Sequence, residues 1–145
     1  MQRLYLLRHG EASDGYPDHS RQLNPAGRSE VLDTLEQALK RIEPPVQIFH
    51  SGLVRARQTA ELAAQVLGAQ SPQRLDGIDP GGNPAELCDQ DMPAGDLMLV
   101  THNPFVESLA WYLAAEELRI RTGSLVALEL EYWGRGCAEL LWQLK

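Results

Sequence analysis

The sequence predicts an α/β protein with three layers, α/β/α, around a mainly parallel mixed sheet that ends in a C-terminal antiparallel hairpin. Short apolar runs of strand length alternate with longer segments whose apolar residues recur at helical spacing. This alternation is typical of parallel sheets covered by helices on both faces. Near the C-terminus, on either side of Gly134-Arg135-Gly136, the spacing of the apolar residues changes to every second residue. This change predicts the hairpin. We expect a single domain over residues 1–145, because this length suits one buried core.

The first strand and helix flank a long loop. Gln2–Leu7 is an apolar run that predicts the first strand, and Arg8–Leu23 is a polar loop too long for a plain connector. Asn24 offers an N-cap and Pro25 a first-turn proline for a helix that Pro44-Pro45 ends. The apolar positions at helical spacing in this helix are Val31, Leu32, Leu35, Ala38, Leu39 and Ile42.

A second strand and helix follow. Val46–His50 is a short apolar run that predicts a strand. A helix is expected over about Leu53–Leu67, with Gly68 as its C-terminal cap. Gln73–Leu75 is expected to form a minor strand, and one short helix fits around Pro84–Asp89 within a segment rich in Gly, Pro and Asp.

The last third of the chain predicts one more strand–helix unit and the hairpin. Asp96–Thr101 is a buried strand, and Asn103-Pro104 repeats the cap-plus-proline start for a helix over Phe105–Leu118. Ser124–Tyr132 alternates with period two, so that Val126, Leu128, Leu130 and Tyr132 share one face. Cys137–Leu144 is the expected last strand.

Composition excludes several classes of partner. The chain has 13 Lys+Arg against 20 Asp+Glu, a formal net charge of -7, which argues against nucleic-acid binding and against adhesion to anionic membranes. No apolar run approaches the roughly 20 residues of a membrane helix, and no signal peptide is evident. Cys88 and Cys137 are isolated and are expected to be reduced thiols. We expect a cytoplasmic protein.

Polar residues that suit phosphate chemistry follow three of the expected strands. Arg8-His9 follows the first, Ser51 with Arg55 the second, and Thr101-His102-Asn103 a later one, while Arg21 lies in the long loop. In such folds ligands bind outside the carboxyl ends of the strands. Two imidazoles among several arginines describe a pocket for a phosphate dianion, in which one imidazole is the nucleophile.

The chemistry requires these residue types. An imidazole attacks phosphorus only when it is neutral, and nearby arginines disfavour its protonation. The same arginines stabilise the phosphoryl oxygens in the transition state. A covalent phosphohistidine then divides one difficult displacement into two easier ones.

Three motifs together resemble a known family. LLRHGEA, SGLVRARQTA and VTHNP are similar, in order and in position, to the motifs of the histidine phosphatase (phosphoglycerate mutase-like) superfamily. The segment Asp18–Gly27 resembles the Asp-x-x-Arg-Pro-Leu-Thr-x-x-Gly of SixA-type phosphohistidine phosphatases, except that Gln22 replaces Pro and Asn24 replaces Thr. The resemblance implies a phosphoglycerate mutase-like fold over essentially the whole chain.

The resemblance also implies roles for individual residues. His9 would be the nucleophile, and His102 the second histidine of the pocket. Arg8 and Arg55 would bind the phosphoryl group, with Arg21 contacting it from the loop. The nearest match to a proton donor is Asp18, while other carboxylates stay plausible by location, namely Glu11, Asp14, Asp79 and Glu86.

The predicted function is a phosphatase that needs no metal or cofactor, since no metal-ligand spacing such as HxH or HExxH is present. Its expected substrate is phosphohistidine on a phosphotransfer or signalling protein, because a compact chain lacks the inserted segments with which larger relatives cover small substrates. One alternative is a phosphatase of a small phosphomonoester, such as a sugar or nucleotide derivative. The other is a phosphate-binding module without turnover.

Overall fold

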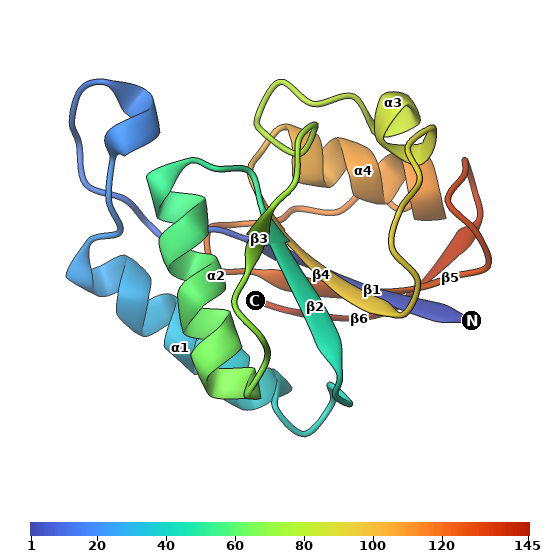
Figure 1. Ribbon diagram of the computed structural model, residues 1–145, viewed down its shortest axis with the longest axis horizontal. Helices are drawn as coiled ribbons and strands as arrows, with labels where there is room; N and C mark the ends of the chain where they lie inside the picture. The colour runs from blue at the N-terminus through green and yellow to red at the C-terminus, as the bar shows by residue number, and fades with distance from the viewer.

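The computed structural model describes residues 1–145, in which a six-stranded sheet lies between two layers of helices (Figure 1). The strands are β1 Gln2–Arg8, β2 Val46–His50, β3 Gln73–Arg74, β4 Asp96–Thr101, β5 Leu125–Leu130 and β6 Ala138–Leu144. The helices are α1 Pro25–Ala38, α2 Val54–Leu67, α3 Pro84–Cys88 and α4 Phe105–Ala114, together with the 3-10 turn η1 Asp18–Ser20.

The sheet is mixed, as predicted. Its strand order is β3-β2-β4-β1-β5-β6, and the first four strands in this order are parallel. β5 runs antiparallel to β1, and β6 antiparallel to β5. The predicted fold class, including the C-terminal hairpin, is therefore confirmed.

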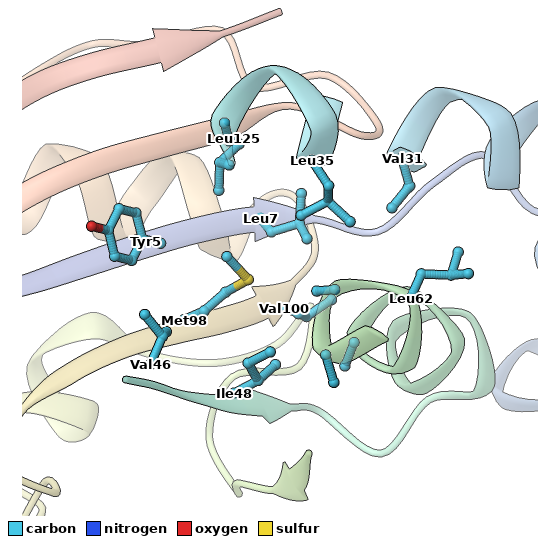
Figure 2. Close-up of a cluster of buried hydrophobic side chains, with 14 of the residues drawn as sticks. Tyr5, Leu7, Val31, Leu35, Val46, Ile48, Leu62, Met98, Val100 and Leu125 are labelled. Atoms are coloured by element: carbon cyan, nitrogen blue, oxygen red, sulfur yellow. The ribbon is translucent and has the colours of Figure 1, made fainter. Parts of the chain in front are cut away.

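The alternation of side chains along β1 divides the interior into two hydrophobic clusters. Tyr5 and Leu7 belong to the cluster under α1 and α2, which Figure 2 shows with side chains from β2, β4 and β5. Leu4 and Leu6 belong to the cluster on the opposite face, under α3 and α4. All four side chains are fully buried, so β1 supplies both clusters.

Two predicted caps form as expected. The side chain of Asn24 accepts a hydrogen bond from the amide of Gly27 at 2.7 Å and caps α1, with Pro25 in the first turn. Gly68 adopts φ 65° at the end of α2, the left-handed conformation that favours glycine.

Two glycines allow the loop after β1 to lie against the start of α1. A Cβ atom on Gly10 would come within 2.6 Å of the carbonyl oxygen of Gly27 and 2.8 Å of Val31 Cγ2. A Cβ atom on Gly27 would overlap the backbone of Glu11. Because the two backbones touch, α1 fixes the chain directly after His9.

The helix expected over Phe105–Leu118 ends at Ala114, four residues earlier. Ala115 adopts a left-handed conformation with φ 54°. Glu116 and Glu117 would place negative charge at the negative end of the helix dipole if the helix continued. The chain instead returns toward the sheet, and Ile120 becomes fully buried.

Smaller corrections concern element ends. α1 stops at Ala38, and Ile42 is buried from the following turn. β5 ends at Leu130, and the side chain of Tyr132 is exposed instead of sharing the buried face. Asn103 does not cap α4 with its side chain, since the N-cap position is Pro104. None of the helices has the length and apolar character needed to cross a membrane.

Candidate active site

The sheet register brings three strand ends to one edge. Arg8, the last residue of β1, pairs with Thr101, the last residue of β4. On the other side of β4, His50 at the end of β2 pairs with Val100. His9, His102 and Ser51 each follow directly after one of these strands, so the three side chains predicted to share a site leave the sheet at the same edge.

His9 has a defined tautomer. Its Nδ1 atom lies 2.7 Å from the carbonyl oxygen of Gly10, and a carbonyl can only accept, so Nδ1 carries the proton. Nε2 therefore keeps its lone pair. The pKa of His9 is lowered to about 4, mainly by burial and in part by the charges of Arg55, Arg8 and Arg21, which together outweigh the rise from the Gly10 hydrogen bond. The ring is neutral at pH 7.

His102 faces His9. The ring centroids are 4.8 Å apart, with 51° between the planes, and His102 is only 1% exposed. Its Nε2 lies 2.6 Å from Ser51 Oγ. Ser51 Oγ accepts from the amide of Leu53 at 3.4 Å, and we assign its hydroxyl proton to the hydrogen bond with Nε2. Nδ1 is then the N–H donor, and it is buried without a partner.

Burial also sets the charge of His102. The pKa of His102 is lowered to about 3, mainly by burial and in part by His9, Arg55 and Arg8. Two neutral imidazoles thus lie together among guanidinium groups. Such a site offers one nucleophilic nitrogen and one hydrogen-bond donor to an anion.

Arg55 and Arg21 both contact Asp18 of η1. Arg55, which is 6% exposed, donates from Nη1 to the Asp18 carbonyl oxygen at 3.0 Å and from Nη2 to Oδ2 at 3.2 Å. Arg21 donates from Nη1 to Oδ1 at 3.1 Å and from Nε to the carbonyl oxygen of Ser13. The hydrogen bond from Arg21, together with Arg55, holds the pKa of Asp18 below its usual range. Asp18 is therefore a carboxylate at neutral pH, which disfavours its predicted role as proton donor.

The side chain of Arg8 is hydrogen-bonded to the segment that follows α4. Its Nη1 donates to the carbonyl oxygen of Ile120 at 2.9 Å, while its Nε is buried without a partner. The structure thus brings Arg8 to the end of β1 beside His9, and it places Arg55 and Arg21 together on Asp18.

Two residues without a predicted role fix the geometry of the site. Thr59 Oγ1 accepts a hydrogen bond from the amide of Gly10 at 3.2 Å and donates to the carbonyl oxygen of Arg55 at 2.8 Å. Gln58 Oε1 accepts from the amide of Leu23 at 2.8 Å. They are the Gln-Thr of SGLVRARQTA, so the motif itself was the signal. No group of three or more His, Cys, Asp or Glu side chains is arranged to hold a metal ion.

Comparison with known proteins identifies the family. A family model described as histidine phosphatase superfamily (branch 1) matches residues 4–81, which include His9 and Arg55. The chain belongs to the histidine phosphatase superfamily. The family predicted from the three motifs is therefore confirmed.

Several solved structures share this fold. The protein histidine phosphatase SixA, in complex with tungstate, superposes with a TM-score of 0.82 at 22% identity, covering 99% of this chain and 96% of SixA. SixA of Agrobacterium tumefaciens gives a TM-score of 0.80 at 26% identity, covering 99% and 97%. A phosphoserine phosphatase mutant from Entamoeba histolytica, in complex with phosphoserine, gives 0.68 at 15% identity, covering 99% and 96%.

A sequence relative is an uncharacterized protein of Picosynechococcus sp., which is 29% identical over 140 residues, covering 86% of this chain and 83% of the relative. Together with the SixA structures, the family match supports a phosphatase activity and the SixA-like assignment within the histidine phosphatase superfamily.

Proposed function

We propose that this protein is a metal-independent phosphatase that carries the phosphoryl group covalently on His9 and acts on phosphohistidine in a partner protein. One observation carries the proposal. A neutral His9, whose Nε2 has a free lone pair, faces His102, whose buried Nδ1 donor has no partner within the protein. Nucleophile and anion donor thus lie side by side at the edge of the sheet.

Several donors are available to the phosphoryl oxygens. Nδ1 of His102 and Nε of Arg8 are both buried and unpartnered, and unpartnered buried donors are rare unless a ligand uses them. The guanidinium of Arg55 supports anion binding once Asp18 releases it. Fixed donors in a buried site stabilise the transition-state charge strongly, because they need no reorganisation. The same positive charges repel a metal cation.

The reaction proceeds in two displacements. In the first, Nε2 of His9 attacks phosphorus, the bond from phosphorus to the substrate imidazole breaks, and that imidazole leaves as the neutral species when its other nitrogen is protonated. In the second, water attacks the phosphorus, the bond from phosphorus to Nε2 of His9 breaks, and Nε2 recovers its lone pair. One proton of the water passes to the solvent, and inorganic phosphate is released. Dividing the transfer in this way is the advantage of covalent catalysis. An imidazole leaving group needs no carboxylic acid donor, in keeping with an ionised Asp18.

The structural neighbours and the short α3 support a protein substrate. SixA, named as a protein histidine phosphatase, superposes over 99% of this chain. α3 has only five residues, so the segment between β3 and β4 adds little chain that could cover a small substrate. Hydrolysis of a small phosphomonoester is the second candidate, favoured by the likeness to a phosphoserine phosphatase in complex with phosphoserine.

The test compares two kinds of substrate. Phosphate release is measured, with EDTA present, from a phosphohistidine-bearing phosphotransfer protein and from a panel of small phosphomonoesters at equal concentrations. We expect much faster turnover of the phosphoprotein. Preference for one small ester would favour the second candidate.

The nucleophile is tested separately. The His9→Ala variant is expected to fold and to lose turnover. A brief incubation of the wild-type protein with labelled substrate should trap an acid-labile, base-stable phosphoprotein, as a phosphohistidine requires. Phosphate binding without any phosphoprotein or turnover would indicate a phosphate-binding module instead.

A further inference from the structure

A carboxylate that has no assigned role contacts the segment that holds Arg8. Glu107 lies in the first turn of α4 and is half-buried. Its Oε2 accepts hydrogen bonds from the backbone amide of Ile120 at 2.8 Å and from Nδ2 of Asn103 at 2.9 Å. The same Nδ2 also donates to the carbonyl oxygen of Ile120 at 3.1 Å. The amide N–H and the carbonyl oxygen of Ile120 are therefore both hydrogen-bonded to side chains at the start of α4.

Ile120 in turn sets the position of Arg8. Its carbonyl oxygen accepts the single hydrogen bond that the Arg8 side chain makes, from Nη1 at 2.9 Å. The side chain of Ile120 is fully buried, so this backbone segment is fixed by packing as well as by Glu107. Glu107 is thus linked to the Arg8 guanidinium by two hydrogen bonds, one to the amide of Ile120 and one from Arg8 to the carbonyl oxygen of Ile120.

We propose that Glu107 is a positioning residue for the phosphatase reaction: by holding Ile120, it fixes the Arg8 guanidinium in the orientation that binds the phosphoryl group. This inference rests on the proposed function, because it needs Arg8 to contact phosphate. A misplacement of an oxyanion donor by a fraction of an ångström lowers the rate strongly, since catalysis depends on donors that are already in place.

Two simpler roles of the Glu107 carboxylate must be excluded by experiment. A negative charge in the first turn stabilises a helix, so Glu107 could serve only the stability of α4. It could also act on Arg8 through its charge alone. Burial lowers the pKa of Arg8, and the charges of Glu107 and Glu30 oppose that effect. Kinetics and stability must therefore be measured together, and charge must be separated from geometry.

The experiment compares Glu107→Ala and Glu107→Gln with the wild-type protein and with Glu117→Ala, a control that removes an exposed glutamate just beyond α4. For each we measure phosphate release, the inhibition constant of vanadate, and the melting temperature. Glu107→Ala should lower kcat/KM by about 10- to 100-fold and weaken vanadate binding. Glu107→Gln should stay within about threefold of wild type, because its amide oxygen still accepts from Ile120 and Asn103. Glu117→Ala should match wild type.

A double-mutant cycle tests the route through Arg8. In the Arg8→Ala background, adding Glu107→Ala should lower vanadate affinity by no more than about twofold, because the group that Glu107 positions is already absent. Fully additive losses would overturn the proposal, as would an unchanged kcat/KM in Glu107→Ala. Loss of activity in Glu107→Gln equal to that in Glu107→Ala would also overturn it, since charge would then be the cause.

Two further outcomes keep the test decisive. If Glu107→Ala does not fold, Glu107→Asp replaces it. In Glu107→Asp the charge remains, but the carboxylate oxygens are withdrawn by the length of one methylene group. The proposal therefore requires lower activity in Glu107→Asp than in Glu107→Gln, and the reverse order refutes it. Absence of turnover and of vanadate binding in the wild-type protein would count against the proposed function itself. Normal wild-type activity together with an unchanged kcat/KM in Glu107→Ala would count against the role of Glu107 alone.

Discussion

The carboxylate of Asp18 forms an ion pair with the guanidinium of Arg55, with Oδ2 3.2 Å from Nη2. The carbonyl oxygen of Asp18 also accepts a hydrogen bond from Nη1 of Arg55 at 3.0 Å. Asp18 also pairs with Arg21. Two arginines predicted to bind phosphate are thus occupied by an internal anion. A phosphoryl group that used both would have to displace the Asp18 carboxylate.

Removing this internal anion should strengthen phosphate binding. Because exposed ion pairs are worth about 1 kcal/mol or less, Asp18→Asn should lower the dissociation constant of inorganic phosphate by about three- to fivefold. Isothermal titration calorimetry measures the change, and Asp14→Asn, which removes another exposed carboxylate of the same loop, is the control. If Asp18 is instead the proton donor, phosphate affinity stays constant while kcat falls on esters with poor leaving groups.

Ser51 should matter through His102. Ser51 Oγ lies 2.6 Å from Nε2, and with the hydroxyl assigned as the donor the proton of the His102 ring is on Nδ1. Ser51→Ala should therefore fold normally and lower kcat/KM by about two- to tenfold, because the proton then divides between the two ring nitrogens and the Nδ1 donor to the phosphoryl group is lost for part of the time. Ser51→Thr, which keeps the hydroxyl, should recover most of the activity. Equal activity of wild type and Ser51→Ala would contradict this role.

Acid should destabilise the protein through its buried imidazoles. His9 stays neutral in the folded protein until pH falls to about 4, whereas in the unfolded chain it takes up a proton near pH 6.5. Between these values the unfolded state binds more protons, so stability falls as pH falls, by up to about 1.4 kcal/mol per pH unit for one group.

Urea unfolding at several pH values between 7 and 4 measures this effect. His9→Gln, which cannot titrate, should show a shallower loss of stability than wild type over that range. His19→Gln, at an exposed histidine, should follow the wild-type curve. If the free energy of unfolding falls equally with pH in His9→Gln and in wild type, then His9 takes up its proton at the same pH in the folded and the unfolded states.

The contact between Gly10 and Gly27 should not tolerate a side chain. A Cβ atom on Gly27 overlaps the backbone of Glu11, which cannot move without moving the chain after His9. Gly27→Ala should lower the free energy of unfolding by about 1 to 3 kcal/mol, the usual cost of overpacking. Gly81→Ala, where a Cβ atom would meet nothing within 4 Å, is the matched control. Thermal unfolding measures both, and equal melting temperatures would contradict the packing argument.

The parallel core and most of the site could be predicted because both are local in the sequence. Apolar runs specified the strands, and His9, Ser51 and His102 each follow one of them within a short motif. The caps Asn24 and Gly68 were predictable for the same reason, since capping depends on neighbouring residues.

The rest depends on contacts between distant segments. Ile120 reaches Arg8 only because α4 ends early at Ala114, and the apolar periodicity of Phe105–Leu118 continues past that point. Asn103 resembles an N-cap in sequence, but its side chain contacts Glu107 and Ile120 instead. The ion pairs of Asp18 with two arginines required the folded position of the long loop. Tertiary contacts decided each of these cases.

The place of β1 in the sheet has a consequence for the order of assembly. β1 is made before the other strands, yet its two neighbours, β4 and β5, begin at Asp96 and Leu125. During synthesis one edge of β1 must wait until Asp96–Thr101 has been made before it can pair, and the other edge must wait until Leu125–Leu130 has been made. Such long-range pairing slows folding and leaves a strand open to aggregation in the meantime. Because Arg8 ends that strand and His9 follows it, the proposed active site can assemble only after β4 has docked.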